Sequence, residues 1–344
     1  MKVVVIRKPD DMHLHLREGN MLANVLPFTS EVFTRGVVMG NLPKPIVTAE
    51  DAKSYREEIA KVRSKFNPIM AIMLTRDTNC QIIKEAFNQG FKILKYIPGS
   101  ASTNADAGVP ITELKNYYHV LELAQKLGMI FSGHWEAPFN GDGIPVPELE
   151  REVQAIPFLE QVVRAFPKLK VVVEHASTKT MIDWVSKAPG NIGATLTAHH
   201  ALLTYADVCN RYGDIYNPHH YCKPIAKTSE DRCSVVAAMI SGNPKFFFGS
   251  DSAPHPLSAK EKTPPSAGIF TAPVVLPLLL ELFERNNAVR RLEDFVSRFG
   301  AEFYGLPLNE GKIFLEKESW TIPEFAGEVR IFKGGQRIKY KIKY

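Results

Sequence analysis

Two histidines near the start of the chain, His13 and His15, have the spacing of a metal half-site. They stand two residues apart in a short apolar run, and alternate residues of a β-strand place their side chains on the same face. Two imidazoles on one face can share a Zn²⁺ ion, although a hydrogen-bonded core pair would have the same spacing. Arg17 has the same parity if the strand continues that far.

Three further candidates for metal or proton chemistry follow later apolar runs. His134 and His175 each end such a run, and each alone is as consistent with a hydrogen-bonded core histidine as with a metal ligand. Asp251 follows the apolar triplet Phe246-Phe247-Phe248. A carboxylate in that setting has few roles besides metal binding, proton transfer or a buried hydrogen bond.

A lysine in the fourth apolar run raises a different chemistry. The ammonium of Lys95 would be repelled by a divalent metal, but a lysine carboxylated by CO₂ is an anionic oxygen ligand that can bridge two metals. Lys92 lies three residues earlier, so the two lysines face opposite sides of a strand and only one can point inward. Periodicity alone does not choose between them.

These residues require a scaffold that gathers the ends of many strands. Short apolar runs alternate with amphipathic helical patterns about eight times, and this alternation predicts a (β/α)₈ TIM barrel. The expected strands are 12–16, 36–40, 69–74, 91–97, 129–133, 170–174, 192–196 and 245–249, and the expected helices are 49–66, 80–89, 111–127, 149–166, 178–188 and 229–240. No GxGxxG motif follows the first strand, which disfavours a doubly wound sheet. We expect a single domain over residues 1–344, with the barrel at about 9–306 and a C-terminal extension at 307–344.

Composition narrows the class of partner. The formal net charge of +5 is a modest excess that suits an anionic small molecule, and the basic tail at 337–344 is expected to be an edge strand or a solvated segment rather than a nucleic-acid site. The four cysteines include no CxxC pair, which is typical of a reducing compartment. We find no signal-peptide core, and prolines interrupt the apolar stretch 272–280. We therefore expect a cytoplasmic protein that binds no membrane.

Taken together, these residues resemble the amidohydrolase superfamily, and specifically the short dihydroorotases of the bacterial type. The resemblance runs from about Pro9 to Leu306. Its most specific stretches are Pro9-Asp-Asp-Met-His-Leu-His-Leu-Arg17, Met39-Gly-Asn-Leu-Pro43, Lys95-Tyr-Ile-Pro98 with Ser102-Thr-Asn104, Glu174-His175, Tyr221-Cys-Lys-Pro224 and 249–255.

The resemblance implies a site with two zinc ions. His13, His15 and Asp251 would bind one ion and His134 and His175 the other, with carboxylated Lys95 shared between them. Asp251 would also be the catalytic proton shuttle. The implied substrate contacts are the side chains of Arg17, Asn41 and His255, the backbone at Lys223 and Ala267, and the hydroxyls of Ser102 and Thr103. At position 223 the family more often has an apolar residue, a difference of little consequence for a backbone contact.

The implied activity is the reversible cyclisation of N-carbamoyl-L-aspartate to (S)-dihydroorotate in pyrimidine (UMP) biosynthesis, by a homodimer. The loop 98–108 follows Lys95 directly and consists of small and polar residues, with no apolar periodicity to anchor it. We therefore expect it to be a mobile lid over the site.

Two alternatives remain at this stage. Hydantoinase-like and allantoinase-like cyclic amidases resemble longer chains with a substantial segment before the paired histidines, whereas twelve residues precede His13 here. A catalytically inactive barrel that serves as an assembly subunit typically loses metal ligands, whereas every ligand position is filled here.

Overall fold

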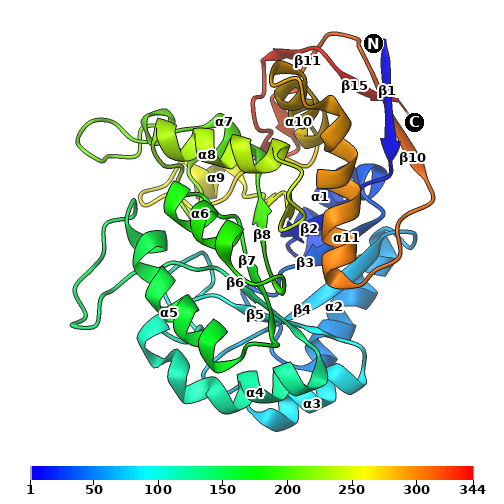
Figure 1. The fold of residues 1–344 in the computed structure, drawn as a ribbon. Helices are drawn as coiled ribbons and strands as arrows, with labels where there is room; N and C mark the ends of the chain where they lie inside the picture. Colours follow the sequence, from blue (N-terminus) through cyan, green and yellow to red (C-terminus); the bar gives the residue numbers. More distant parts are fainter. Residues whose placement is uncertain (1, 344) are drawn as a thin grey trace.

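A parallel eight-stranded barrel forms the centre of the computed structural model, which describes residues 2–343 (Figure 1). Its strands pair in chain order: β2 (Asp11–Leu14), β3 (Arg35–Val38), β4 (Asn67–Met73), β5 (Ile93–Tyr96), β6 (Ile130–Gly133), β7 (Lys170–Val173), β8 (Ile192–Leu196) and β9 (Phe246–Phe248). Backbone hydrogen bonds from His15 to Ser252 (3.0 Å) and from Asp251 to His13 (2.8 Å) join the ends of the first and last strands. The predicted barrel and all its predicted strands are confirmed.

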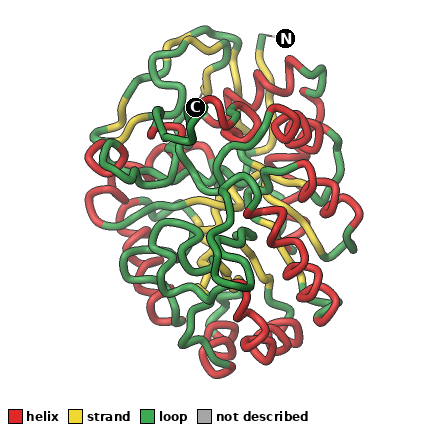
Figure 2. The backbone as a smooth tube through the Cα atoms, turned by 90° about the vertical axis from the view of Figure 1, so that its left-hand side faces the viewer, coloured by secondary structure: helices red, strands yellow, loops and turns green. Residues whose placement is uncertain are grey.

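Helices surround the strands, as the tube in Figure 2 shows. The six predicted helical segments contain α2 (Ala49–Val62), α3 (Cys80–Asn88), a 3₁₀ turn (Ile111–Tyr117) running into α4 (Tyr118–Leu127), α5 (Arg151–Ala165), α6 (Lys179–Lys187) and α8 (Ser229–Ile240). Local chemistry sets their ends. Helix α2, for example, begins with a capping box in which the Thr48 hydroxyl accepts from the Asp51 amide and the Asp51 carboxylate accepts from the Thr48 amide.

Within residues 2–343, five α-helices lie outside the predicted segments. These are α1 (Gly19–Val32), α7 (Ala198–Leu202), α9 (Leu257–Lys260), α10 (Val275–Arg285) and α11 (Phe299–Tyr304). The prolines around α10 made its sequence resemble an interrupted apolar stretch, but Pro277 lies in the first helical turn, where a missing amide proton costs no hydrogen bond. Within the described residues, no helix combines the length and apolarity needed to cross a membrane.

A small antiparallel sheet brings the two ends of the chain together. Strand β1 (Val3–Arg7) pairs with β10 (Lys312–Glu316), which pairs in turn with β15 (Lys341–Lys343). The first and last strands therefore lie on either side of β10, at the upper right of Figure 1. Of the two structures that the sequence left open for the basic tail, β15 is the edge strand.

Side-chain alternation along the strands carries polar residues to one end of the barrel. Ile93, Ile130, Val172 and Phe247 pack together in one buried cluster. Residues two or four positions further along each strand direction lie on the same face and closer to the carboxyl end. The residues placed in this way include Lys95, Ser132, His134 and Glu174, and Asp251 follows the end of β9 at the same rim; all five are buried. The carboxyl rim is the active-site end in barrels of this class.

Candidate active site

Asp251 lies against both histidines of the first pair. Its Oδ1 is 3.4 Å from His13 Nε2 and 3.2 Å from His15 Nε2. Although burial raises the pKa of Asp251, hydrogen bonds from the two histidines lower it well below its usual range. Burial lowers the pKa of His15 to about 4. An ionised carboxylate and a neutral imidazole are the protonation states that bind a metal.

His134 and His175 form a second pair beside the first. Their facing nitrogens, His134 Nδ1 and His175 Nε2, are 3.1 Å apart, and the His175 ring lies 5.0 Å from that of His13. Two ligands of a tetrahedral zinc ion with bonds of about 2.0 Å lie about 3.3 Å apart. The donor spacings within both groups, from 3.1 to 3.4 Å, therefore fit shared metal ions.

Lys95 lies inside the barrel, whereas Lys92 is on the surface, where its ammonium faces the Phe87 ring. Lys95 is 1% exposed, and its Nζ has no hydrogen-bond partner among residues 2–343. Burial lowers the pKa of Lys95 to about 8, although Glu174 and Asp251 oppose the shift. The Lys95 amine is buried, has no hydrogen-bond partner, and has a pKa close to neutral pH. These properties suit it to covalent modification.

Two buried glutamates orient the histidines from behind. Glu174 Oε2 lies 2.7 Å from His13 Nδ1, and Glu136 Oε2 lies 2.8 Å from His134 Nε2. Each carboxylate fixes the proton on the nitrogen it faces and leaves the other nitrogen free to bind a metal. The roles of both glutamates were missed from sequence, although Glu174 is an acidic residue at the end of an apolar strand.

The backbone at three of the predicted site residues is in the left-handed region. The φ angles are 63° at Arg17, 43° at His175 and 43° at Asp251. Non-glycine residues adopt this conformation at some cost, and it is common at functional sites. The strand does not continue to Arg17, so the shared parity that depended on it does not hold: β2 ends at Leu14 and the chain turns before Arg17.

Most of the predicted substrate residues line one narrow pocket beside the histidines. Its lining comprises His15, Arg17, Asn41, Ser102, Thr103, Lys223, Asp251, Ala253, Ala267 and Gly268. His255 lies behind this pocket, with its Nε2 2.9 Å from both the Arg17 guanidinium and the Ala267 carbonyl oxygen. The structure therefore brings together a guanidinium, an amide side chain and two hydroxyls next to the histidine cluster.

The loop 98–108 covers this pocket. Asn41 Nδ2 donates to the Thr103 carbonyl at 3.0 Å, and Thr103 Oγ1 donates to the Ala267 carbonyl at 3.3 Å. The expectation that nothing anchors the loop was wrong, because Ala101 and Ala105 are fully buried against Ile97. Small side chains allow the loop to pack closely, which a search for large apolar residues does not detect. Its mobility remains a prediction.

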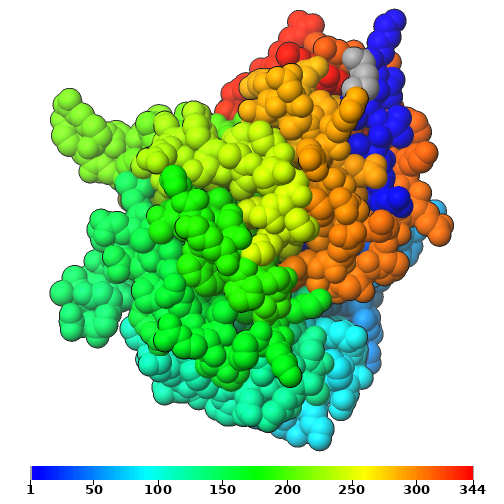
Figure 3. Space-filling model, viewed as in Figure 1, coloured from blue at the N-terminus to red at the C-terminus, as the bar shows by residue number. Residues whose placement is uncertain are grey.

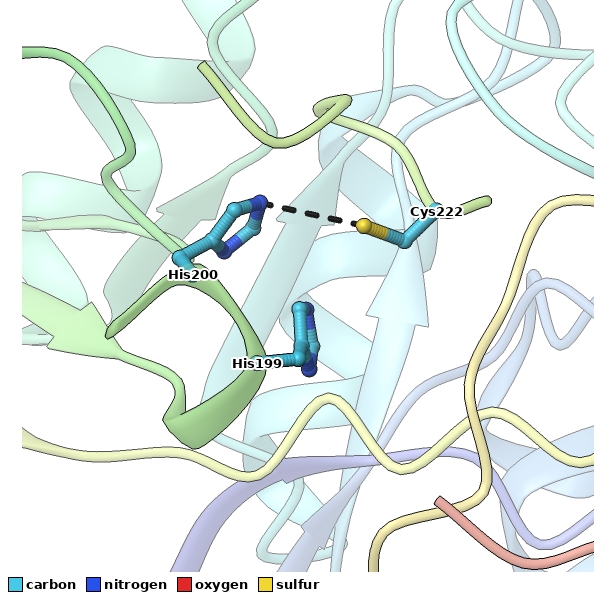
Figure 4. A group of neighbouring side chains, drawn as sticks. All are labelled: His199, His200 and Cys222. Atoms are coloured by element: carbon cyan, nitrogen blue, oxygen red, sulfur yellow. Dashed lines mark hydrogen bonds between the residues drawn. The ribbon is translucent and has the colours of Figure 1, made fainter. Parts of the chain in front are cut away.

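A second group of potential metal ligands lies next to the site: His199, His200 and Cys222 (Figure 4). Cys222 Sγ is 3.9 Å from His200 Nε2. That nitrogen also lies 2.9 Å from the Pro224 carbonyl, to which the Cys222 thiol donates at 3.2 Å. The other ring nitrogen, His200 Nδ1, forms a hydrogen bond with Thr197 Oγ1 at 2.8 Å. We therefore interpret His200 and Cys222 as a hydrogen-bonded brace for the segment 221–224.

His199 differs from its neighbour. It is fully buried, and neither ring nitrogen has a hydrogen-bond partner in the part of the chain that the structure describes. Its Nε2 lies 4.0 Å from Asp251 Oδ2, the oxygen that faces away from His13 and His15. His199 lies in α7, three residues after β8 ends, and its residue type and spacing indicated no role in the sequence.

Comparison with known proteins supplies the family. No family model matches the chain. A dihydroorotase from Coxiella burnetii (strain RSA 331 / Henzerling II) is 41% identical over 100% of this chain and 99% of its own length. The chain belongs to the dihydroorotase family. The structure of a Saccharomyces cerevisiae dihydroorotase in complex with 5-fluoroorotic acid superimposes with a TM-score of 0.93 at 30% identity, covering 100% of this chain and 99% of the yeast chain.

The hydantoinase alternative shares the fold only. An L-hydantoinase from Arthrobacter aurescens has a TM-score of 0.79 but 14% identity, and the match covers 98% of this chain and 82% of the hydantoinase. The dihydroorotase matches have both higher identity and coverage of nearly the whole relative. Membership of the dihydroorotase family, within the amidohydrolase superfamily, is therefore the reading that the comparisons support, and it makes the chain a hydrolase of cyclic amides.

Proposed function

We propose that this chain catalyses the reversible cyclisation of N-carbamoyl-L-aspartate to (S)-dihydroorotate, the dihydroorotase reaction of pyrimidine synthesis. The observation that carries the proposal is the contact between two histidine pairs, Asp251 and a pocket that contains Arg17. The histidine pairs and Asp251 suit a metal-activated hydrolysis, and the pocket with Arg17 suits a substrate carboxylate. Full-length identity of 41% to a dihydroorotase supports the same assignment.

The metal in this proposal is a pair of zinc ions. His13, His15 and Asp251 would hold one ion, His134 and His175 the other, and Lys95 would contribute to both as a carboxylated side chain. Carboxylation joins the neutral Lys95 amine to CO₂, forms an N–C bond and releases one proton. The lowered pKa of Lys95 supports this step, because burial increases the fraction of neutral amine.

Zinc ions bound there would lower the pKa of a water molecule and polarise the substrate carbonyl. Asp251 would supply the proton transfer: in ring opening it accepts the proton of the attacking water and passes it to the departing ring nitrogen. Ring closure uses the same group in reverse. The ionised state of Asp251 and its place beside the pocket suit this role.

Arg17 would bind the substrate carboxylate. A guanidinium is planar and can donate two parallel hydrogen bonds to a carboxylate. Arg17 Nε donates to the Pro254 carbonyl at 2.9 Å and one terminal nitrogen lies against His255, so its orientation is fixed before substrate binds. Asn41 and His255 would complete the carboxylate site, and the backbone at Lys223 and Ala267 would bind the ring amide groups.

The loop 98–108 would act as a lid. Ser102 and Thr103 line the pocket from above, and their hydroxyls would donate hydrogen bonds to the substrate while the loop excludes bulk water. The contacts of Thr103 with Asn41 and Ala267 would be exchanged for substrate contacts.

Beyond the site, we propose a cytoplasmic homodimer with a single functional domain over residues 1–344, and no nucleic-acid or membrane partner. All four cysteines are free thiols in the structure, which suits a reducing compartment.

The test of the function is turnover by the purified, zinc-loaded protein. Ring opening of dihydroorotate should lower its ultraviolet absorbance, and N-carbamoyl-L-aspartate should give the reverse change. Hydantoin and allantoin serve as control substrates. Loss of hydantoin or allantoin without loss of dihydroorotate would overturn the proposal.

A further inference from the structure

A buried lysine outside the metal cluster holds three backbone carbonyl groups. Lys260, the last residue of α9, is 4% exposed. Its ammonium donates to the carbonyl oxygens of Tyr221 (3.0 Å), Ser266 (2.9 Å) and Gly268 (2.7 Å). An ammonium has three N–H donors and no acceptor, so every donor of Lys260 is used.

The three carbonyls belong to two segments that face the substrate pocket. Lys223 lies in the first segment and Ala267 in the second, and both line that pocket. The Gly268 amide donates to the Tyr221 carbonyl at 2.9 Å, so the segments already touch. Lys260 adds a link to each of them and thereby fixes their separation.

This wall also carries the contacts of the carboxylate site and the lid. The Ala267 carbonyl accepts from Thr103 Oγ1, and His255 Nε2 lies 2.9 Å from the same oxygen. On the far side, His200 and Cys222 hold the first segment through the Pro224 carbonyl. A shift of the second segment would therefore move Ala267 together with the groups that depend on its carbonyl.

Lys260 has no carboxylate partner among the described residues, so an ion pair does not explain its burial. Removing an ammonium from water is costly unless hydrogen bonds replace the lost hydration. Burial lowers the pKa of Lys260 to about 7, and the positive charge of the nearby Arg17 guanidinium acts in the same direction. Burying an ammonium beside a binding pocket at this desolvation cost indicates that Lys260 contributes to binding in that pocket.

We propose that Lys260 is a positioning residue for substrate recognition, which fixes the backbone wall of residues 221–223 and 266–268 so that its amide groups meet the substrate. It acts through this wall and does not touch substrate or metal. The inference rests on the proposed function, because it assigns these backbone groups to dihydroorotate.

The test compares Lys260→Met with wild type in substrate affinity, turnover and metal content. Met has similar length but no N–H donor, so the wall loses all three links. The KM for dihydroorotate and the Kd for orotate, a planar analogue, should both rise about 10- to 100-fold, because several hydrogen bonds to a charged substrate are misaligned together. The kcat should fall less than threefold, and zinc content should be unchanged.

A matched control separates positioning from general stability. Arg35→Met removes a buried cation at the opposite end of the barrel, where Arg35 binds the Asp10 carboxylate at 2.5 Å. It should lower the melting temperature and leave KM unchanged. Lys260→Arg, which keeps the charge and donors, should recover part of the lost affinity.

The outcomes distinguish a failure of the Lys260 role from a failure of the proposed dihydroorotase function. Wild type that neither binds orotate nor turns over dihydroorotate would overturn both. If the wild type is active and the KM and Kd of Lys260→Met lie within twofold of the wild-type values, only the role of Lys260 is overturned. If the Met variant does not fold, the same measurements on Lys260→Gln decide, with affinity loss expected and wild-type affinity contradicting the proposal.

Discussion

Replacing Glu174 by Gln should weaken zinc binding while the barrel stays folded. Glu174 Oε2 lies 2.7 Å from His13 Nδ1 and accepts from Thr195 Oγ1 at 2.6 Å, and Oε1 accepts from the Ser132 hydroxyl. The Gln amide oxygen can accept the first two hydrogen bonds, and the Ser132 hydroxyl can rotate to accept from the amide nitrogen. The substitution therefore removes the negative charge and keeps the shape and the contacts.

The expected loss follows from the role of the carboxylate as a partner of a metal-binding histidine. Removing such a partner costs roughly 10- to 100-fold in metal affinity, which is about 1.4–2.7 kcal/mol. The loss should fall on the ion that His13 binds, because the His134 ion has its own partner in Glu136. One of the two zinc ions should therefore dissociate at a lower chelator concentration than in wild type.

Chelator competition with a zinc indicator measures both affinities in one titration. Glu281→Gln is the matched control, because Glu281 is also buried, at 5% exposure, but lies in α10 and contacts Arg285. It should leave both affinities unchanged. If folded Glu174→Gln protein released its two ions within twofold of the wild-type affinities, the claim that Glu174 tunes His13 would be refuted.

Four further outcomes follow from the proposed site. Lys95→Ala should lose turnover and regain part of it when short carboxylic acids are added, and a lack of rescue with zinc still bound would contradict the bridging role. Asp251→Asn should abolish turnover in both directions, whereas near-normal rates with both metals present would move the proton transfer to another group. Arg17→Ala should weaken handling of dihydroorotate by about 1.5–3 kcal/mol in kcat/KM, as expected for hydrogen bonds to a charged group, and unchanged kinetics would argue against an anionic substrate. Replacing Ser102 and Thr103 together with Ala should lower turnover strongly without altering zinc content or melting temperature, and a double variant with wild-type turnover would rule out the lid.

The barrel was accessible from sequence because its strands are buried on both faces. Runs such as Val171-Val172-Val173 and Phe246-Phe247-Phe248 are uniformly apolar, and polar residues at their carboxyl ends mark the rim. Helix α10 was missed because its residues from Val275 to Phe283 are all buried and nearly all apolar, so the stretch resembled an apolar run broken by prolines rather than a surface helix.

The site was less accessible, because its outer contacts join segments far apart in the chain. Nothing in the sequence pairs Glu174 with His13, 161 residues earlier, or directs Lys260 to carbonyls at Tyr221 and Gly268. Lys260 also resembles an ordinary surface lysine in sequence. Only the fold shows that its ammonium is buried.

The two loops that project furthest from the body carry exposed apolar side chains, at Ile144 (59% exposed) and Tyr212 (74%) (Figures 1 and 3). They share one turn design. In each, an asparagine side chain, Asn140 or Asn210, accepts from the backbone amides two and four residues later. This likeness between the loops was not recognised from sequence, because it lies in turn geometry rather than in a motif of catalytic residues.

A metal titration of activity shows whether dihydroorotate turnover by this chain depends on two zinc ions. Metal-free protein receives increasing equivalents of zinc in the presence of bicarbonate, and ring opening of dihydroorotate is followed at each step. We expect no turnover without zinc and a rise to a plateau at two equivalents per chain. Full turnover without zinc, or no turnover of dihydroorotate at any zinc level, would refute this dependence.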